Sequence, residues 1–226
     1  MAKKKPVSGV ETIEQTLSKT EQYIENNQKM LTIIIVGILI IIGGYLAYMK
    51  LYLKPLETEA ISQMFAAEQY FEKDSFQLAI DGDGNMPGFI DIIDEYGSTK
   101  AGNLSNYYAG ICYLRLGQYD DAIEYLESFS SDDIMLSAVS IGAIGDAYME
   151  KGETQTAVEK YLNAAKTNPN EFSTPIFLMK AGRAYEILGD YKNALVQYQA
   201  IEKDYNQSSE GRTIEKYIIQ AKLKAK

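Results

Sequence analysis

The apolar residues of this chain follow two different patterns, one continuous and one periodic. Met30 to Met49 is a run of twenty residues without a charge, and eleven of them are Ile, Leu or Val. At about 1.5 Å per helical residue, such a run crosses the roughly 30 Å hydrocarbon layer of a membrane. Beyond it, apolar residues recur every three or four positions between glycine turns, which is typical of amphipathic helices. We therefore expect an all-α protein with one transmembrane helix.

The continuous run is best interpreted as an uncleaved signal anchor. It is longer than the apolar region of a cleaved signal peptide, and no small-x-small cleavage site follows it. A buried core helix is the alternative, but the run is apolar on every side and Lys29 and Lys50 bracket it. Gly43 and Ala47 form a small-x-x-x-small pair on which another membrane helix could pack, although such pairs also occur by chance.

Basic residues near the two ends of the span predict its orientation, because they are enriched on the cytoplasmic side. Five lysines precede the run and three follow it at a similar distance. They are Lys3, Lys4, Lys5, Lys19 and Lys29 before it, and Lys50, Lys54 and Lys73 after it. We expect the N-terminus in the cytoplasm and the larger C-terminal part across the membrane, in the periplasm of a bacterium with an inner membrane.

The tail before the span also has a helical pattern. Ser8 and Glu11 fit a capping box. The residues that follow make one stripe of a helix, namely Val10, Ile13, Leu17, Thr20 and Ile24. Two interpretations remain open: a short docking helix that lies on membrane lipid or on a partner, and a marginal helix that is largely disordered alone.

Three copies of one pattern follow the span, with periods of 35 and 37 residues. Each copy has an apolar residue followed by Gly, a Tyr three positions after that Gly, and then Ala and a large residue in a second helix. The copies are Ala109-Gly110, Tyr113, Ala122 and Leu126; Ile144-Gly145, Tyr148, Ala157 and Tyr161; and Ala181-Gly182, Tyr185, Ala194 and Tyr198. Gly117, Gly152 and Gly189 lie at the turn between the two helices of each copy. This is the pattern of the tetratricopeptide (TPR) repeat, a helix-turn-helix unit that stacks into a solenoid.

The chemistry of this pattern is packing rather than catalysis. A small residue is required where the two helices of a unit cross, and a glycine ends the first helix with a positive φ.

Further units are predicted on either side of the three repeats. Ala67, Tyr70, Phe76 and Ala79 predict a degenerate fourth unit that a Gly-rich loop interrupts, and Glu210 to Lys224 predicts a capping helix. We therefore expect five segments: 1–29 as a cytoplasmic tail, 30–49 as the transmembrane anchor, 50–102 as a linker helix and degenerate repeat, 103–206 as three repeats, and 207–226 as the cap.

Composition argues against most catalytic chemistry. The chain has no histidine, one cysteine and a net charge of -9. We expect Cys112, inside an apolar run, to be buried rather than reactive. Asp81, Asp83 and Asn85 have the spacing of a calcium loop, but Met86 stands at the required glycine and Ile92 at the bidentate glutamate. We therefore expect no enzyme, no metal site and no cofactor, and the acidic balance disfavours nucleic acid.

The first helix of each repeat should line a concave groove with apolar side chains, which suits adaptable binding of a hydrophobic protein segment. The alternative is that a neighbouring helix, Glu57 to Phe71, fills the groove. Offsets from the pattern place these candidate groove residues: Ile61, Met64, Phe71, Leu104, Tyr107, Ile111, Leu114, Val139, Met149, Ile176, Met179 and Arg183.

The whole layout resembles the YfgM family, the ancillary subunit of the bacterial Sec translocon. The similarity rests on the order of tail, span and repeats, and on the segments Ile92 to Gly102 and Tyr205 to Gly211. The resemblance implies a non-catalytic inner-membrane protein beside the translocon subunits and a membrane-anchored peptidyl-prolyl isomerase chaperone, assisting secreted client proteins in the periplasm. The alternative is a TPR scaffold for another envelope assembly, such as cell division or outer-membrane biogenesis.

Overall fold

The computed structural model describes residues 21–225. The chain divides between Pro55 and Leu56 into two compact units, which we describe separately. The predicted tail helix of Val10 to Ile24 lies for the most part outside the described residues, as does the capping box at Ser8.

The first unit contains α2 (Gln28–Tyr48) and a π-helical turn, η1 (Met49–Leu53). One helical stretch, Gln28–Glu72, is long and apolar enough to cross a membrane, which agrees with the predicted span in position and composition. No residue of α2 is buried within the described chain. Gly43 and Ala47 lie on this exposed surface, and a Cβ on Gly43 would meet nothing within 4 Å.

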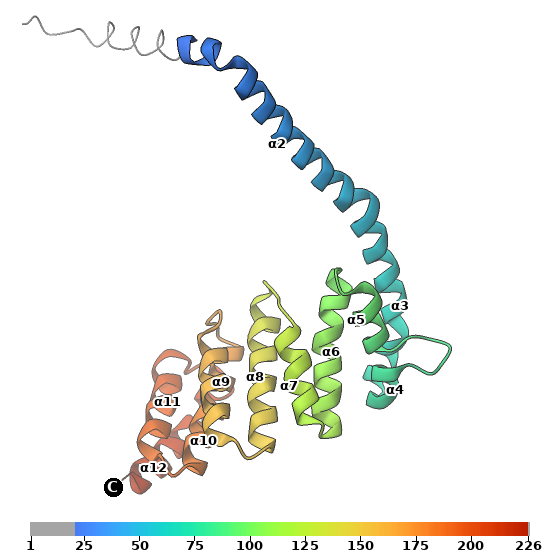
Figure 1. Cartoon of the computed structure of the whole chain (residues 1–226). Helices are drawn as coiled ribbons and strands as arrows, with labels where there is room; N and C mark the ends of the chain where they lie inside the picture. Colours follow the sequence, from blue (N-terminus) through green and yellow to red (C-terminus); the bar gives the residue numbers. More distant parts are fainter. Residues whose placement is uncertain (1–20, 226) are drawn as a thin grey trace, which may run out of the picture. The chain divides into compact units, whose positions relative to one another are not determined.

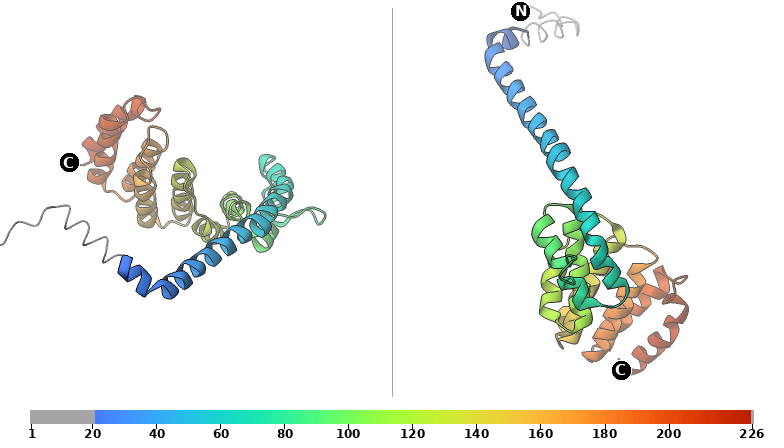
Figure 2. Two further views of the ribbon diagram at one scale, coloured as in Figure 1. Left: turned by 90° about the horizontal axis from the view of Figure 1, so that it is seen from above. Right: turned by 90° about the vertical axis from the view of Figure 1, so that its right-hand side faces the viewer.

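The second unit is a row of helices, and from α4 to α12 each helix packs on the next one along the chain (Figures 1 and 2). The part of the chain described has no strand. The helices are α3 (Lys54–Glu72), α4 (Phe76–Asp81), α5 (Phe89–Tyr96), α6 (Lys100–Leu116), α7 (Tyr119–Ser128), α8 (Ile134–Glu150), α9 (Thr154–Lys166), α10 (Ser173–Ile187), α11 (Tyr191–Asp204), the 3-10 turn η2 (Gly211–Thr213) and α12 (Ile214–Lys224). The pairs α6–α7, α8–α9 and α10–α11 are the three predicted repeats.

Contacts at the helix crossings confirm the predicted repeat register. A Cβ on Gly110 would lie 2.6 Å from Leu126 Cγ, and one on Gly145 would lie 2.6 Å from Tyr161 Cε1. A Cβ on Gly182 would collide with the ring of Tyr198 in the same way. Each glycine therefore lets the large residue sixteen positions later in the second helix reach the first helix.

The turn glycines have the conformation that the sequence predicts. Gly117, Gly152 and Gly189 have φ of 77°, 79° and 75°. The residue after each glycine donates its N–H to the carbonyl oxygen of the pattern tyrosine, as Gln118 does to Tyr113 at 2.9 Å. This Schellman arrangement ends the first helix of every repeat and sets the direction of the second.

The degenerate unit consists of α3, α4 and α5. Asp74 takes the turn position with φ of 56°, where the full repeats have glycine. The loop between α4 and α5 is organised by Asp83, whose Oδ1 accepts the N–H groups of Asn85 and Met86 at 2.9 and 2.8 Å. Its Oδ2 accepts the hydroxyl of Tyr70 at 2.8 Å. The loop thus reconnects the two halves of the interrupted second helix.

The buried side chains form successive clusters along the row of helices. Cys112 lies in the first cluster with no exposed surface, which confirms its predicted burial. Burial raises the pKa of its thiol to about 12, so it stays protonated and unreactive. At the other end, Ile214, Ile218 and Ala221 of α12 cover Tyr198 and Ile201 of α11, as the predicted cap requires.

Candidate functional site: an open groove along the repeats

A groove of about 1660 Å³ runs along α6, α8 and α10, the first helices of the three repeats. Its floor is largely apolar, and the loops before α10 and after α11 contribute polar groups at one end. Eight predicted residues line it: Phe71, Tyr107, Ile111, Leu114, Val139, Met149, Ile176 and Arg183. Among the described residues no helix fills this space, and α3 contributes only Phe71 to its lining.

The structure places the other four predicted residues outside this groove. Met64 is buried in the first cluster, where its Sδ accepts the hydroxyl of Ser105 at 3.2 Å. Met179 is buried against α11 and α12 and borders a small adjoining hollow. Leu104 packs partly on the first cluster, and Ile61 is exposed away from the groove. Packing of an adjacent helix explains the correction for Met64, Met179 and Leu104, whereas Ile61 is exposed on a part of α3 that does not line the groove.

Aromatic residues form the wall nearest α6. The ring of Tyr107 lies 5.8 Å from that of Tyr108 and 5.4 Å from that of Phe129. Burial raises the pKa of Tyr107, so the hydroxyl stays neutral. Ile111 and Leu114 lie beside it and pack partly against the fourth cluster. These three side chains therefore serve both the groove and the core beneath it.

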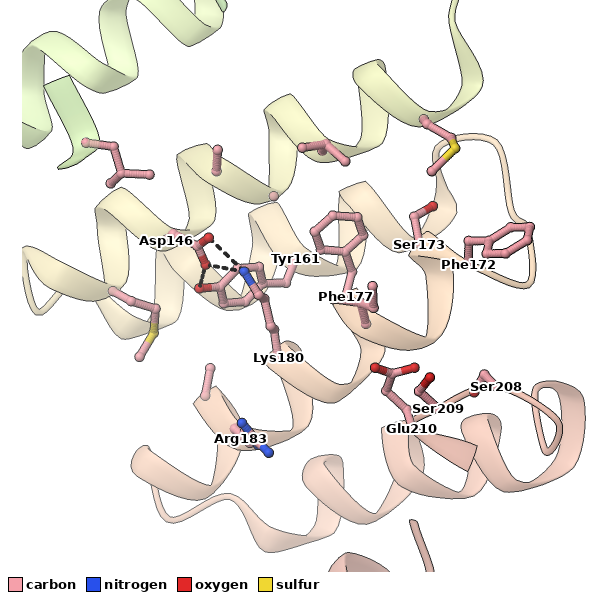
Figure 3. A pocket seen from close by; sticks show the side chains of 18 of the residues that line it. Asp146, Tyr161, Phe172, Ser173, Phe177, Lys180, Arg183, Ser208, Ser209 and Glu210 are labelled. Atoms are coloured by element: carbon pink, nitrogen blue, oxygen red, sulfur yellow. Dashed lines mark hydrogen bonds and ion pairs between the residues drawn. The ribbon is translucent and has the colours of Figure 1, made fainter. Parts of the chain in front are cut away.

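An ion pair between two repeats crosses the middle of the groove (Figure 3). Lys180 Nζ of α10 lies 2.7 Å from both carboxylate oxygens of Asp146 of α8. The hydroxyl of Tyr161 donates to Asp146 Oδ1 at 2.7 Å, and Lys180 lies 5.6 Å from the centre of the Tyr161 ring. Burial, and then the bonded carboxylate, raise the pKa of Tyr161, so it remains a hydrogen-bond donor. The cluster is charge-balanced and joins the second repeat to the third.

The corresponding position of the next repeat has a different chemistry. Arg183 follows Gly182 as Asp146 follows Gly145, and it donates to the hydroxyl of Tyr217 at 2.8 Å. Its guanidinium lies 5.4 Å from the Tyr217 ring centre, a cation–π distance. That hydrogen bond, together with the positive charge, lowers the pKa of Tyr217. Arg183 therefore brings a positive charge to the end of the groove that Glu210 also lines.

At the end of the groove near α10, the sequence analysis predicted Ile176 and Arg183 but missed the residues that the adjoining loops contribute. Phe172, with 73% of its surface exposed, and Ile176, with 41%, lie at its edge, while Phe177 is buried against Gly142. Ser208, Ser209 and Glu210 border the same end from the loop after α11 (Figure 3). These loops lie outside the repeat period, so no offset pointed to them. Lys180 could have been found, because it stands 34 residues after Asp146, about one repeat period.

The other candidate chemistry has a structural explanation. Both carboxylate oxygens of Asp83 are occupied by loop and tyrosine donors, as described above. Within residues 21–225, no group of three His, Cys, Asp or Glu side chains is arranged to hold a metal ion. The Asp81–Asn85 segment is therefore explained as a loop that connects α4 to α5.

Comparisons with known proteins agree with this architecture. Residues 105–132 and 143–209 match two tetratricopeptide repeat families. Human Superkiller complex protein 3 is 24% identical over 148 residues, which is 65% of this chain and 9% of that protein. Tetratricopeptide repeat protein 37 of Xenopus laevis is 30% identical over 92 residues, 41% of this chain and 6% of that protein. The chain thus spans less than a tenth of these curated relatives.

Two solved structures share the fold. Both contain nearly identical TPR-like repeats of a Podosopora anserina protein assigned as a kinesin light chain, and one of them is a substituted form. Each has a TM-score of 0.56 and covers 75% of this chain, with 17% and 16% identity, and this chain covers 87% and 88% of theirs. The chain is thus an all-helical TPR-type solenoid, a class of scaffold that generally mediates protein–protein contacts without catalysis.

Proposed function

We propose that the groove binds a polypeptide segment of a partner protein, and that the partner is a component or client of the Sec translocon at a bacterial inner membrane. The observation that carries the binding proposal is the open groove with exposed apolar side chains at its edge, above all Phe172 and Ile176. Large apolar side chains that a partner can bury often supply most of an interface's energy, about 2 kcal/mol or more each.

The choice of the translocon rests on the resemblance to the YfgM family and on the membrane-crossing helix ahead of the repeats. In this proposal α2 anchors the protein beside the channel, with Gly43 and Ala47 available for a neighbouring membrane helix. The repeats then stand in the periplasm, receive segments of emerging clients and pass them to a membrane-anchored peptidyl-prolyl isomerase chaperone. A scaffold for cell division or outer-membrane biogenesis would use the same groove with another partner.

The test uses side chains that line the groove without supporting the core. Tyr107 and Leu114 are unsuitable, since both pack partly against buried clusters and their loss would also weaken the fold. Phe172→Ser together with Ile176→Ser removes apolar surface at the edge of the groove, and neither residue belongs to a buried cluster. Val196→Ser is the matched control, because Val196 is 56% exposed on α11 and is not among the lining residues.

The full chain is purified from bacterial membranes in mild detergent, and the recovery of translocon subunits and of the chaperone is measured. The double variant should lose them several-fold while Val196→Ser retains them. If both variants retain every partner in normal yield, the groove is not the binding surface. If the unchanged protein recovers cell-division or outer-membrane assembly proteins instead, the alternative scaffold is the correct function.

A further inference from the structure

One position recurs at the contact between successive repeats. In three units it is held by Tyr108, Lys180 or Tyr217, each of which reaches back to the first helix of the unit before, and in the middle repeat it is held by Ala143. Tyr108 lies edge-on to Phe71 with ring centres 5.0 Å apart. Lys180 pairs with Asp146, and Tyr217 accepts from Arg183, in both cases 34 residues earlier. The equivalent residue in the degenerate unit is Phe65, two positions before Ala67 as Tyr108 is two before Gly110.

Within residues 21–225, no repeat unit precedes Phe65 for it to pack on. It is 61% exposed, and Ile61, one helical turn earlier, is 55% exposed. The buried stripe of α3 consists of Ala60, Met64 and Ala67, so the exposed pair lies on a different face of the helix. Residues four apart form the ridges by which helices pack on one another. The N-terminal end of the solenoid therefore presents an unfilled repeat-stacking surface.

The opposite end of the solenoid presents a similar pair. In α12 the buried stripe of Ile214, Ile218 and Ala221 faces α11. Ile219, 52% exposed, and Leu223, 66% exposed, lie on the outer face, again four residues apart. The outer face of a terminal solenoid helix is ordinarily polar, because a capping unit keeps the protein soluble. This cap instead exposes a second apolar ridge.

The two ends carry opposite charge. Helix α3 (Lys54–Glu72) holds four glutamates and one lysine, Lys54, whereas α12 (Ile214–Lys224) holds three lysines and one glutamate. Burial, and then the nearby Glu72, raise the pKa of Glu68, so negative charge is already crowded on α3. Two α3 helices would therefore repel each other, while the basic α12 would be attracted.

We infer that the solenoid associates head to tail with a second copy of this chain, the outer face of α12 in one copy lying on α3 of the next. Ile219 and Leu223 would pack against Ile61 and Phe65, with the lysines of α12 beside the glutamates of α3. Such a contact joins unlike surfaces, so it builds rings or open chains rather than a closed pair. Two helices bury little area, so the contact is weak in solution. Attachment to one membrane raises the effective concentration.

Cross-linking in a membrane tests this contact without disturbing the core. Phe65→Cys and Leu223→Cys are made in separate full-length chains, reconstituted together in phospholipid vesicles and treated with a short bis-maleimide. The native Cys112 is fully buried, and any cross-linking through it is the same background in every sample. A dimer that joins one chain of each variant should form several-fold more than dimers within either variant alone.

The matched control is Val196→Cys, which is also exposed and apolar but lies on α11 rather than on α3 or α12. Adding Lys216→Glu and Lys222→Glu to the Leu223→Cys chain should reduce the mixed dimer several-fold. Thermal unfolding identical to that of the unchanged chain would show that all variants are folded. The proposal is overturned if the mixed dimer is no more abundant than the dimer of the Val196→Cys control. It is also overturned if the Phe65→Cys chain forms as much dimer with itself as it forms with the Leu223→Cys chain, or more.

Discussion

Tyr161 shows how a single side chain links packing to the groove. Its ring lies where Gly145 lacks a Cβ, which lets α9 cross α8 closely. Its hydroxyl reaches past that crossing to Asp146, which in turn holds Lys180 of the next repeat. The missing Cβ of Gly145 therefore allows Tyr161 to reach Asp146, and so positions the hydrogen-bonded network that includes Lys180.

The first prediction concerns this crossing. Gly145→Leu should place carbon atoms in the space of the Tyr161 ring and lower the free energy of unfolding by about 1–3 kcal/mol or more. Thermal unfolding of the full chain in detergent, followed by circular dichroism, measures the change. Gln155→Leu on the exposed side of α9 is the control and should alter the melting temperature little. Equal melting temperatures for the two variants would show that Gly145 is not at a tight crossing.

At the scale of elements, the loop between α4 and α5 depends on the charge of Asp83. The amide N–H groups of Met86 and Asn85, followed by the Tyr70 hydroxyl, hold the pKa of this carboxyl below its usual range. A group with a depressed folded-state pKa contributes stability above its unfolded-state pKa, and this contribution is lost as pH falls through the folded-state value. The loop should therefore weaken in acid.

The second prediction follows from this loss of stability in acid. Asp83→Asn should lower the melting temperature at neutral pH, and the difference from the unchanged chain should shrink as the pH is lowered below the usual range of a carboxyl. Melting curves over a series of pH values measure both effects. Asp132→Asn, before α8, is the control for the loss of one exposed negative charge. A difference that stays constant with pH would contradict the role given to the Asp83 carboxylate.

The third prediction concerns the cap. A chain that ends after Gln207 lacks η2 and α12, and so exposes Tyr198 and Ile201, which are fully buried in the intact protein. Repeats contact only their neighbours, so loosening should be greatest in α10 and α11 and least in α6 and α7. Hydrogen exchange read by mass spectrometry resolves these segments. Uniform protection across all repeats in the shortened chain would mean that α12 is not a stabilising cap.

For the whole molecule, the main question is which side of the membrane holds the repeats. The lysine bias predicts the tail in the cytoplasm and everything after Lys50 across the membrane. A reporter that is active only after export should therefore work when fused after Lys226. A reporter that is active only in the cytoplasm should fail at the same point. The reverse pair of results would invert the orientation and remove the translocon proposal with it.

The groove was only partly predictable from the sequence. Offsets from the repeat pattern specify which face of a first helix points inward, and that was sufficient for Tyr107, Ile111 and Val139. They do not specify how far the neighbouring helix overlaps that face. Met64 and Met179 stand at inward offsets, yet adjacent helices bury them. Phe172 and the Ser208–Glu210 segment belong to loops outside the period, so only the folded chain brings them to the groove.

The sequence by itself determined the helical repeats, their register and a helix long and apolar enough to cross a membrane. These features depend on short-range constraints: a small residue at each crossing, a glycine with positive φ at each turn, and twenty consecutive apolar residues. The tertiary structure decided which side chains share the groove, how Asp146 meets Lys180, and which apolar pairs stay exposed at Phe65 and Leu223. Those outcomes depend on contacts between helices distant in the chain, whose relative rotation no local pattern specifies.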